Sequence, residues 1–95
     1  MKFNSTSEEQ IYAILLNEWD PIGIKDIVEA QDEYVVYLPM VVKLLLDQKY
    51  EYLVTYLSEV ETERMGFSEA DKEKINKAVK LLGNIQMLPT KNLGT

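Results

Sequence analysis

Four carboxylates lie close together in the first half of the chain and could do chemistry if the fold brings them together. They are Asp26, Glu29, Asp32 and Glu33. Converging carboxylates can bind a divalent cation or serve as a general acid and base. Their spacing lacks the alternating oxygen ligands and central glycine of an EF-hand loop, and the chain has no Glu-x-x-His pair of a di-iron bundle. A solvated acidic face is the preferred interpretation, with a partner-binding surface as the functional alternative.

The side chains that most enzymes use are missing from this composition. The chain contains no Cys and no His. It therefore cannot form disulfides, thiolate or imidazole metal sites, or Ser–His and Cys–His nucleophile pairs. It also has no Gly-rich loop of the kind that binds phosphate. We predict a protein that is not an enzyme and holds no cofactor or metal, and an enzyme that uses only carboxylates and tyrosines is the remaining catalytic alternative.

A second group of side chains could recognise another protein. Along a predicted helix, offsets of 0, 4, 7 and 11 place four residues in one stripe: Tyr52, Tyr56, Glu59 and Glu63. Tyrosine rings bury a large area at low entropic cost, and carboxylates accept paired hydrogen bonds from arginine. We predict a partner-binding surface along this stripe. The alternative is that the rings pack against a neighbouring helix and their hydroxyls reach water.

The charge of the chain favours a basic partner. Net charge is −6, and the acidic residues lie mainly in the first 70 residues, whereas residues 71–95 are basic. An acidic surface repels phosphate backbones and anionic lipids, and it speeds encounter with a basic protein. The basic stretch lacks arginine and interleaved aromatic residues, so nucleic-acid binding is disfavoured. Its lysines are Lys72, Lys74, Lys77 and Lys80.

The elements that position these residues are all helical. A chain of 95 residues suits one domain with one core, spanning 1–95. A capping-box pattern starts a helix near Ser7, and an Asp-Pro-x-Gly turn ends it at residues 20–23. A longer second helix follows to Gln48, and we expect a kink at Pro39 because its apolar spacing runs through the proline. A fresh helix with Pro39 at its first position is the alternative.

Two further helices complete the predicted bundle. The third runs from Tyr50 to Arg64 and ends at Gly66, in the left-handed conformation that glycine favours. The fourth begins with an N-cap within residues 68–71 and ends at Gly83, before a short tail, 84–95, that is expected to be less ordered. The sequence thus predicts an all-α protein, a compact bundle of about four helices.

Two side chains are assigned to the structure of this bundle rather than to a ligand. Arg64, the only arginine, lies near the end of the third helix, where a cation is favourable. We expect it to pair with Glu61 or with Asp20. Trp19 is expected to anchor the core beside the turn that follows it.

The chain also contains three short motifs: W-D-P-I-G-I within residues 15–24, D-E-Y at residues 32–34, and E-T-E-R-M-G at residues 61–66. Together they resemble a family of small all-helical bacterial proteins of unknown function, over most of residues 10–67. The resemblance implies a fold and a bacterial origin. In charge and size the chain also looks like bacterial immunity proteins. It lacks the tyrosine-pair motif of the colicin DNase immunity family, so that comparison is an analogy.

These observations together predict a binding protein. We expect an acidic immunity or antitoxin-type domain that neutralises a basic toxin by direct contact, with a nuclease as the favoured toxin. The alternative is a helical adaptor or a housekeeping homodimer that covers the apolar residues 41–46 with a second copy. The N-terminus leads into polar residues, and no apolar run reaches the length of a membrane span, so we expect a cytoplasmic protein without membrane contact.

Overall fold

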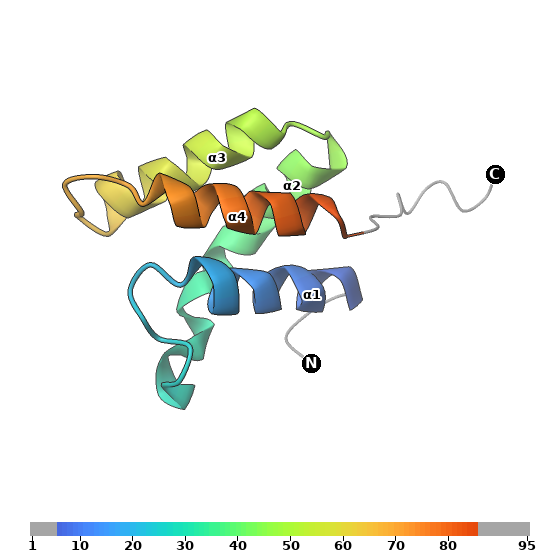
Figure 1. Ribbon diagram of the computed structural model, residues 1–95. Coiled ribbons are helices and arrows are strands. Elements are labelled where there is room, and N and C mark those ends of the chain that lie inside the picture. The colour runs from blue at the N-terminus through green and yellow to red at the C-terminus, as the bar shows by residue number, and fades with distance from the viewer. Residues whose placement is uncertain (1–5, 86–95) are drawn as a thin grey trace.

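The computed structural model describes residues 6–85, apart from the side chains of Thr6 and Gln31, and every regular element in this range is a helix (Figure 1). None of these helices combines the length and the apolar character needed to cross a bilayer. The elements are α1 (Thr6–Ile14), the π-helical turn η1 (Leu15–Trp19), the 3-10 helix η2 (Val28–Tyr37), α2 (Leu38–Leu46), α3 (Tyr50–Glu59), the π-helical turn η3 (Val60–Arg64) and α4 (Lys72–Gly83).

Helix α4 lies between α3 and α1, and α2 crosses behind them (Figure 1). Each helix turns its apolar stripe toward the shared interior, as in an amphipathic bundle. All four apolar residues predicted for the inner face of the last helix are buried: Ile75, Ala78, Val79 and Leu82. The prediction of an all-α bundle of four helices is confirmed.

Both α1 and α3 widen into a single π-helical turn before they end. In η1 the amide of Asp20 donates to the carbonyl of Leu15 at 2.8 Å, and in η3 the amide of Met65 donates to the carbonyl of Val60 at 3.0 Å. Because a π turn holds more residues than an α turn, it rotates the side chains that follow. In η3, Glu61 follows the buried Leu57 by four residues and lies in the interior, where its side chain is 2% exposed.

The same rotation changes the position of Arg64. The α-helical spacing placed Arg64 on the apolar side of its helix, but its side chain is exposed. The expected pairing of Arg64 with Glu61 or Asp20 is wrong. Arg64 is exposed, and the two carboxylates instead accept hydrogen bonds from N–H and O–H groups elsewhere in the chain. A period of 3.6 residues cannot be carried through a π turn.

At Pro39 the chain changes from one kind of helix to another. In place of the single α-helix bent at Pro39 that we predicted, a 3-10 helix runs to Tyr37 and α2 begins at Leu38. The proline lies in the first turn of α2, where its missing N–H has no intrahelical partner to lose. The alternative of a fresh helix therefore describes this region better than the kink.

The turns and caps lie where the sequence placed them. The amide of Gly23 donates to the carbonyl of Asp20 at 3.2 Å and closes the turn after η1. Gly66 has a φ of 82° just beyond η3, the backbone region that glycine enters without strain. Asp71 caps α4, because its Oδ1 accepts from the amide of Lys74 at 3.2 Å. Local side-chain chemistry thus determines these boundaries.

Helix α4 ends at Gly83, as predicted. A Cβ atom built on Gly83 would lie 3.4 Å from Cε1 of Tyr50, an ordinary contact, so the end of α4 packs beside the start of α3. Of the expected tail, Ile85 is half-buried and packs against the core. Residues 86–95 lie outside the described residues.

We expect Gly66→Ala to lower the free energy of unfolding by about 1–2 kcal/mol, the cost of a left-handed conformation for a residue with a Cβ. Steric contact would not contribute, because a Cβ at Gly66 has no neighbour within 4 Å. Chemical denaturation measures the change. Gly66→Asn is the matched variant, since asparagine tolerates this conformation, and an equal loss in both variants would contradict the explanation.

Candidate functional site

A buried hydrogen bond joins two residues that lie 42 positions apart, Trp19 and Glu61. The indole Nε1 of Trp19 donates to Oε2 of Glu61 at 2.7 Å, and the backbone amide of Asp71 donates to Oε1 at 2.8 Å. A buried carboxylate is tolerated only when hydrogen bonds replace its water. This one connects the end of α1, the end of α3 and the N-cap of α4.

The carboxylate of Asp20 organises the loop after η1 in the same way. Its Oδ1 accepts from the amide of Ile24 at 2.7 Å and from the hydroxyl of Tyr34 at 2.8 Å. Its Oδ2 accepts from the amide of Lys25 at 3.3 Å. The Tyr34 hydroxyl in turn accepts from the amide of Ile22 at 3.2 Å. Asp20 therefore fixes both the loop and the 3-10 helix that follows it.

Aromatic contacts link the two carboxylate clusters. The ring of Trp19 lies 5.2 Å from that of Tyr34, centroid to centroid, and 6.0 Å from that of Tyr37 in an edge-on arrangement. Trp19 is a core anchor, as predicted. Each of the three sequence motifs contributes a residue to this buried network, since Trp19, Tyr34 and Glu61 come from different motifs.

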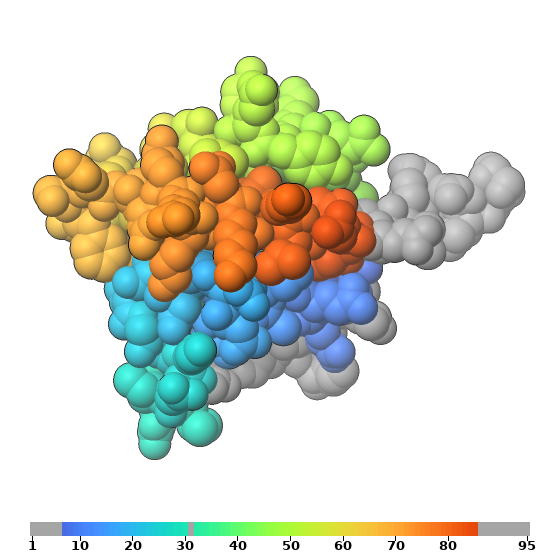
Figure 2. All heavy atoms as spheres, in the orientation of Figure 1, coloured from blue at the N-terminus to red at the C-terminus, as the bar shows by residue number. Residues whose placement is uncertain are grey.

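Residues 25–37 form a projection beside this network, which we call the acidic arm. It includes η2 and appears as the teal lobe that extends below α1 in Figure 2. A 3-10 helix has three residues per turn, so Tyr34 and Tyr37 share one face. Both are buried, and they attach the arm to the bundle. The other two faces of η2 are left to carry exposed side chains.

All four carboxylates predicted as candidate site residues on this segment are exposed: Asp26, Glu29, Asp32 and Glu33. Glu29 and Asp32 lie one 3-10 turn apart and so share a face. Among residues 6–85, no group of three or more acidic side chains is arranged to hold a metal ion. The structure therefore presents these carboxylates to solvent, with Glu33 on a different face of η2 from Glu29 and Asp32.

Large apolar side chains are exposed on the same arm, and the sequence patterns did not single them out. Val28 is 76% exposed and Val36 is 67% exposed, and Ile27 is also exposed. Val36 lies one 3-10 turn after Glu33 and thus shares its face. Ile27 and Val36 fall outside the three-residue spacing of Tyr34 and Tyr37, whereas Val28 continues that spacing at the start of η2 and is exposed nonetheless. The arm thus combines negative charge with apolar area.

The four residues of the predicted stripe on α3 differ in how exposed they are. Tyr52 is 64% exposed, with Lys49 Nζ 5.5 Å from its ring centroid. Tyr56 is half-buried against the core, as the packing alternative described. Burial raises the pKa of the Tyr56 hydroxyl, and the charge of Arg64 partly offsets that rise. The two carboxylates predicted for this stripe, Glu59 and Glu63, are exposed.

Glu63 does not continue the line of the other three residues. It lies in η3, where the π turn rotates it away from the stripe that α-helical spacing predicts. Within α3, the exposed residues of the predicted stripe are therefore Tyr52 and Glu59, whereas Tyr56 packs against the core. Of the two predicted surfaces, the acidic arm offers the larger group of exposed candidates.

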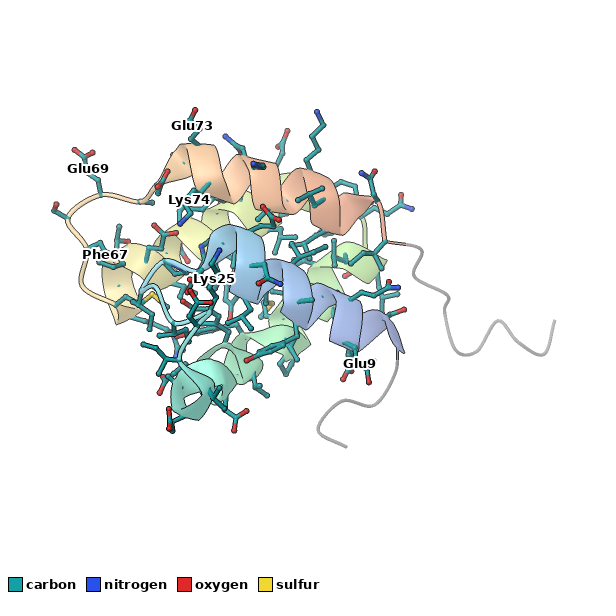
Figure 3. The ribbon with its side chains drawn as sticks, turned by 60° about the horizontal axis from the view of Figure 1, so that its bottom comes forward. Glu9, Lys25, Phe67, Glu69, Glu73 and Lys74 are labelled. Carbon is teal, nitrogen blue, oxygen red and sulfur yellow. The ribbon has the colours of Figure 1, made fainter. Side chains whose placement is uncertain are left out.

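A hollow of about 220 Å³ lies next to the Trp19–Glu61 hydrogen bond. Trp19 and Glu61 come from η1 and η3, and Pro21 from the turn after η1. The other lining residues belong to the segment that leads into α4 and to the first turn of α4. Figure 3 labels three of the latter, Phe67, Glu69 and Lys74. The full lining is Trp19, Pro21, Glu61, Phe67, Glu69, Asp71 and Lys74. Sequence patterns missed this hollow because it joins distant segments.

Comparison of the chain with protein-family models, curated proteins and solved structures finds no match.

We expect Glu61→Gln to lower the free energy of unfolding by about 1–3 kcal/mol, the cost of an unsatisfied buried polar group. The amide nitrogen of glutamine would face one of the two N–H donors, Trp19 Nε1 or the Asp71 amide. Chemical denaturation measures the loss. Glu63→Gln makes the same change at an exposed site in the same turn and should be nearly neutral. Equal effects would contradict the role of the network.

The buried hydroxyl of Tyr34 should make the stability of the protein depend on pH in the alkaline range. Burial raises the pKa of its hydroxyl above the ordinary value of 10.0, the Ile22 hydrogen bond opposes this, and Asp20 adds to it. A raised pKa in the folded state means that the contribution of neutral Tyr34 is complete below pH 10 and is lost as the pH rises further. The free energy of unfolding should therefore fall as the pH rises above 10.

Tyr34→Phe tests this dependence. The variant should be about 0.5–1.5 kcal/mol less stable at neutral pH because it loses a hydrogen-bonded hydroxyl. Above pH 10, however, its stability should fall less steeply than that of the unmodified protein. Denaturant unfolding over a series of alkaline pH values measures both effects. Tyr52→Phe, at an exposed position, is the matched control, and parallel slopes for Tyr34→Phe and the unmodified protein would contradict the prediction.

Proposed function

We propose that this protein is a non-catalytic binding domain and that the acidic arm docks on a basic partner protein. The observation that carries the proposal is the composition of the arm, where four exposed carboxylates accompany the exposed side chains of Ile27, Val28 and Val36. A merely solvated acidic face has no need of exposed valine and isoleucine. Clustered apolar exposure beside polar groups is typical of protein-interaction surfaces.

The two kinds of side chain would have different tasks in such a complex. Apolar side chains such as Val28 and Val36 supply area that binding removes from water. The carboxylates attract a positively charged partner over a distance and select against acidic proteins. Together they favour a partner whose contact surface is basic with apolar interruptions.

The attachment of the arm supports a role in binding. Tyr34 is held by Asp20, and Tyr37 packs edge-on against Trp19, so one face of η2 is fixed to the core. A surface held in place before binding loses little conformational entropy on docking. The arm is therefore suited to recognition by a preformed shape.

The kind of partner we propose is a toxin, in the manner of an immunity or antitoxin protein. A nuclease toxin needs a basic groove for its substrate, and an acidic domain can cover such a groove without any chemistry of its own. The net charge of −6 and the exposed carboxylates of the arm support this choice. The analogy with bacterial immunity proteins in size and charge points in the same direction.

The alternative is a helical adaptor or a homodimer formed through α2. Within its apolar run, Val41 and Leu45 are buried in the core, Val42 and Leu44 are half-buried, and Leu46 is exposed. The core thus uses much of the run that a second copy would have to cover. Light scattering distinguishes the two proposals, because the alternative requires a mass that rises from monomer to dimer with concentration.

Neutralising the arm should weaken binding to the toxin at least about tenfold, because three charges lost from a docking surface slow association and loosen the complex. The ligand to be tested is the product of the adjacent gene, which the proposal requires to be a basic protein, and surface plasmon resonance at two salt concentrations measures binding. The arm variant combines Asp26→Asn, Glu29→Gln and Glu33→Gln. The matched control removes three exposed carboxylates elsewhere: Glu9→Gln, Glu51→Gln and Glu73→Gln.

The control should bind nearly as tightly as the unmodified protein. Equal weakening in both variants would mean that overall charge, and not the arm, determines affinity. Absence of any complex with the adjacent basic protein, by native mass spectrometry as well, would overturn the proposal. Heat on titration with magnesium, manganese or calcium would instead favour the carboxylate enzyme.

A further inference from the structure

We propose that the hollow beside Trp19 and Glu61 receives an arginine side chain of the basic partner. This inference rests on the proposed function and adds a specific anchor to it. Three carboxylates and one amine line the hollow, so negative charge is in excess. The carboxylates belong to Glu61, Glu69 and Asp71, and the amine to Lys74.

The innermost carboxylate is held in a fixed position. Glu61 is 2% exposed, and each of its oxygens accepts one hydrogen bond, from Trp19 Nε1 and from the Asp71 amide. A carboxylate has about four acceptor positions, so each oxygen retains capacity for a further donor. Glu69 and Asp71 are exposed, which leaves their carboxylates accessible from solvent. A cation in the hollow would thus lie among three carboxylate-bearing residues, the innermost of which is fixed in position.

Phe67 makes arginine the better fit than lysine. Its ring lines the hollow and is 38% exposed, although most phenylalanine side chains in a small domain are buried. A guanidinium group is planar, stacks on aromatic faces and donates several hydrogen bonds in fixed directions. An ammonium group is a strongly hydrated point charge. An aromatic wall beside three carboxylates therefore matches a guanidinium group better than an ammonium group.

The segment that forms the wall is tied down. Gly66 reverses the chain with a φ of 82°, and the amide of Phe67 donates to the carbonyl of Glu61 at 3.0 Å. Asp71 then caps α4 through the amide of Lys74. The wall and the floor therefore share the same anchor residue, Glu61, and the hollow is formed before a ligand arrives.

The position of the hollow fits a partner that also covers the acidic arm. Pro21 belongs both to the lining and to the loop that leads into the arm. In Figure 1 this loop and the loop between η3 and α4 lie at the same end of the molecule. One basic surface could therefore contact the arm and place an arginine in the hollow.

Nuclear magnetic resonance with N-acetyl-arginine amide as the probe tests the site directly. Trp19 is the only tryptophan, so its indole N–H gives a single resonance that reports on the floor of the hollow. We expect this resonance and that of the Asp71 amide to shift in a saturable way. N-acetyl-citrulline amide, the neutral analogue, should leave them unchanged. Absence of any shift with the arginine probe, or equal shifts with citrulline, would overturn the site. Equal shifts with N-acetyl-lysine amide would overturn its assignment to arginine.

Two variants that should change the affinity for the arginine probe in opposite directions make the test more specific. Glu69→Gln should weaken binding of the arginine probe several-fold, and Lys74→Gln should strengthen it, because the first removes an attractive charge and the second a repulsive one. Both residues are exposed, so folding should be unaffected. Glu73→Gln is the matched control, since Glu73 is exposed, does not line the hollow and points away from it in Figure 3. The same sign for Glu69→Gln and Lys74→Gln would overturn the proposal.

The two proposals can fail separately. If the arm variants weaken binding to the basic protein while the probe gives no shift, the arginine site is overturned and the proposed function stands. If the probe binds but no basic protein does, the proposed function is overturned and the arginine site stands as a property of the hollow.

Discussion

The carboxylate of Glu61 can remain inside this small bundle only because two N–H groups replace the water it has lost. An unpaired charge in such a place would cost several kcal/mol, a large part of the stability of a domain of this size. The bond to Trp19 holds the end of α1 against the end of α3, and the bond to the Asp71 amide holds the start of α4 against both. Three of the four α-helices therefore depend on one side chain.

The two π turns explain how those side chains meet. η1 carries Trp19 and η3 carries Glu61, and each turn follows an otherwise regular α-helix. An extra residue in a helical turn is rarely favourable by itself, and such turns persist where they serve an arrangement that compensates. Here the compensation is a buried tryptophan with its N–H satisfied and a buried carboxylate with both oxygens satisfied. The same rotation moves Arg64 to the surface.

At one end of the molecule, the buried residues of the network hold the structure in place, and different, exposed residues are available for binding. Trp19, Asp20 and Tyr34 are buried and hold the loop and the arm in position. The residues that remain exposed there, the carboxylates of the arm and Phe67 beside the hollow, are accessible to another molecule. A binding surface of this kind takes its shape from the core and its chemistry from side chains the core does not use.

The sequence by itself determined the helical class, the turn before Gly23, the reversal at Gly66, the cap at Asp71 and the end of α4. Each follows from interactions within a few residues, and local patterns report those well. It also identified the carboxylates of the arm as candidate site residues. Only the tertiary structure decided that Glu61 is buried, that the arm exposes apolar residues and that a hollow forms between distant segments. A pairing across 42 residues, such as that of Trp19 with Glu61, leaves no periodic trace, because it depends on how separate helices pack.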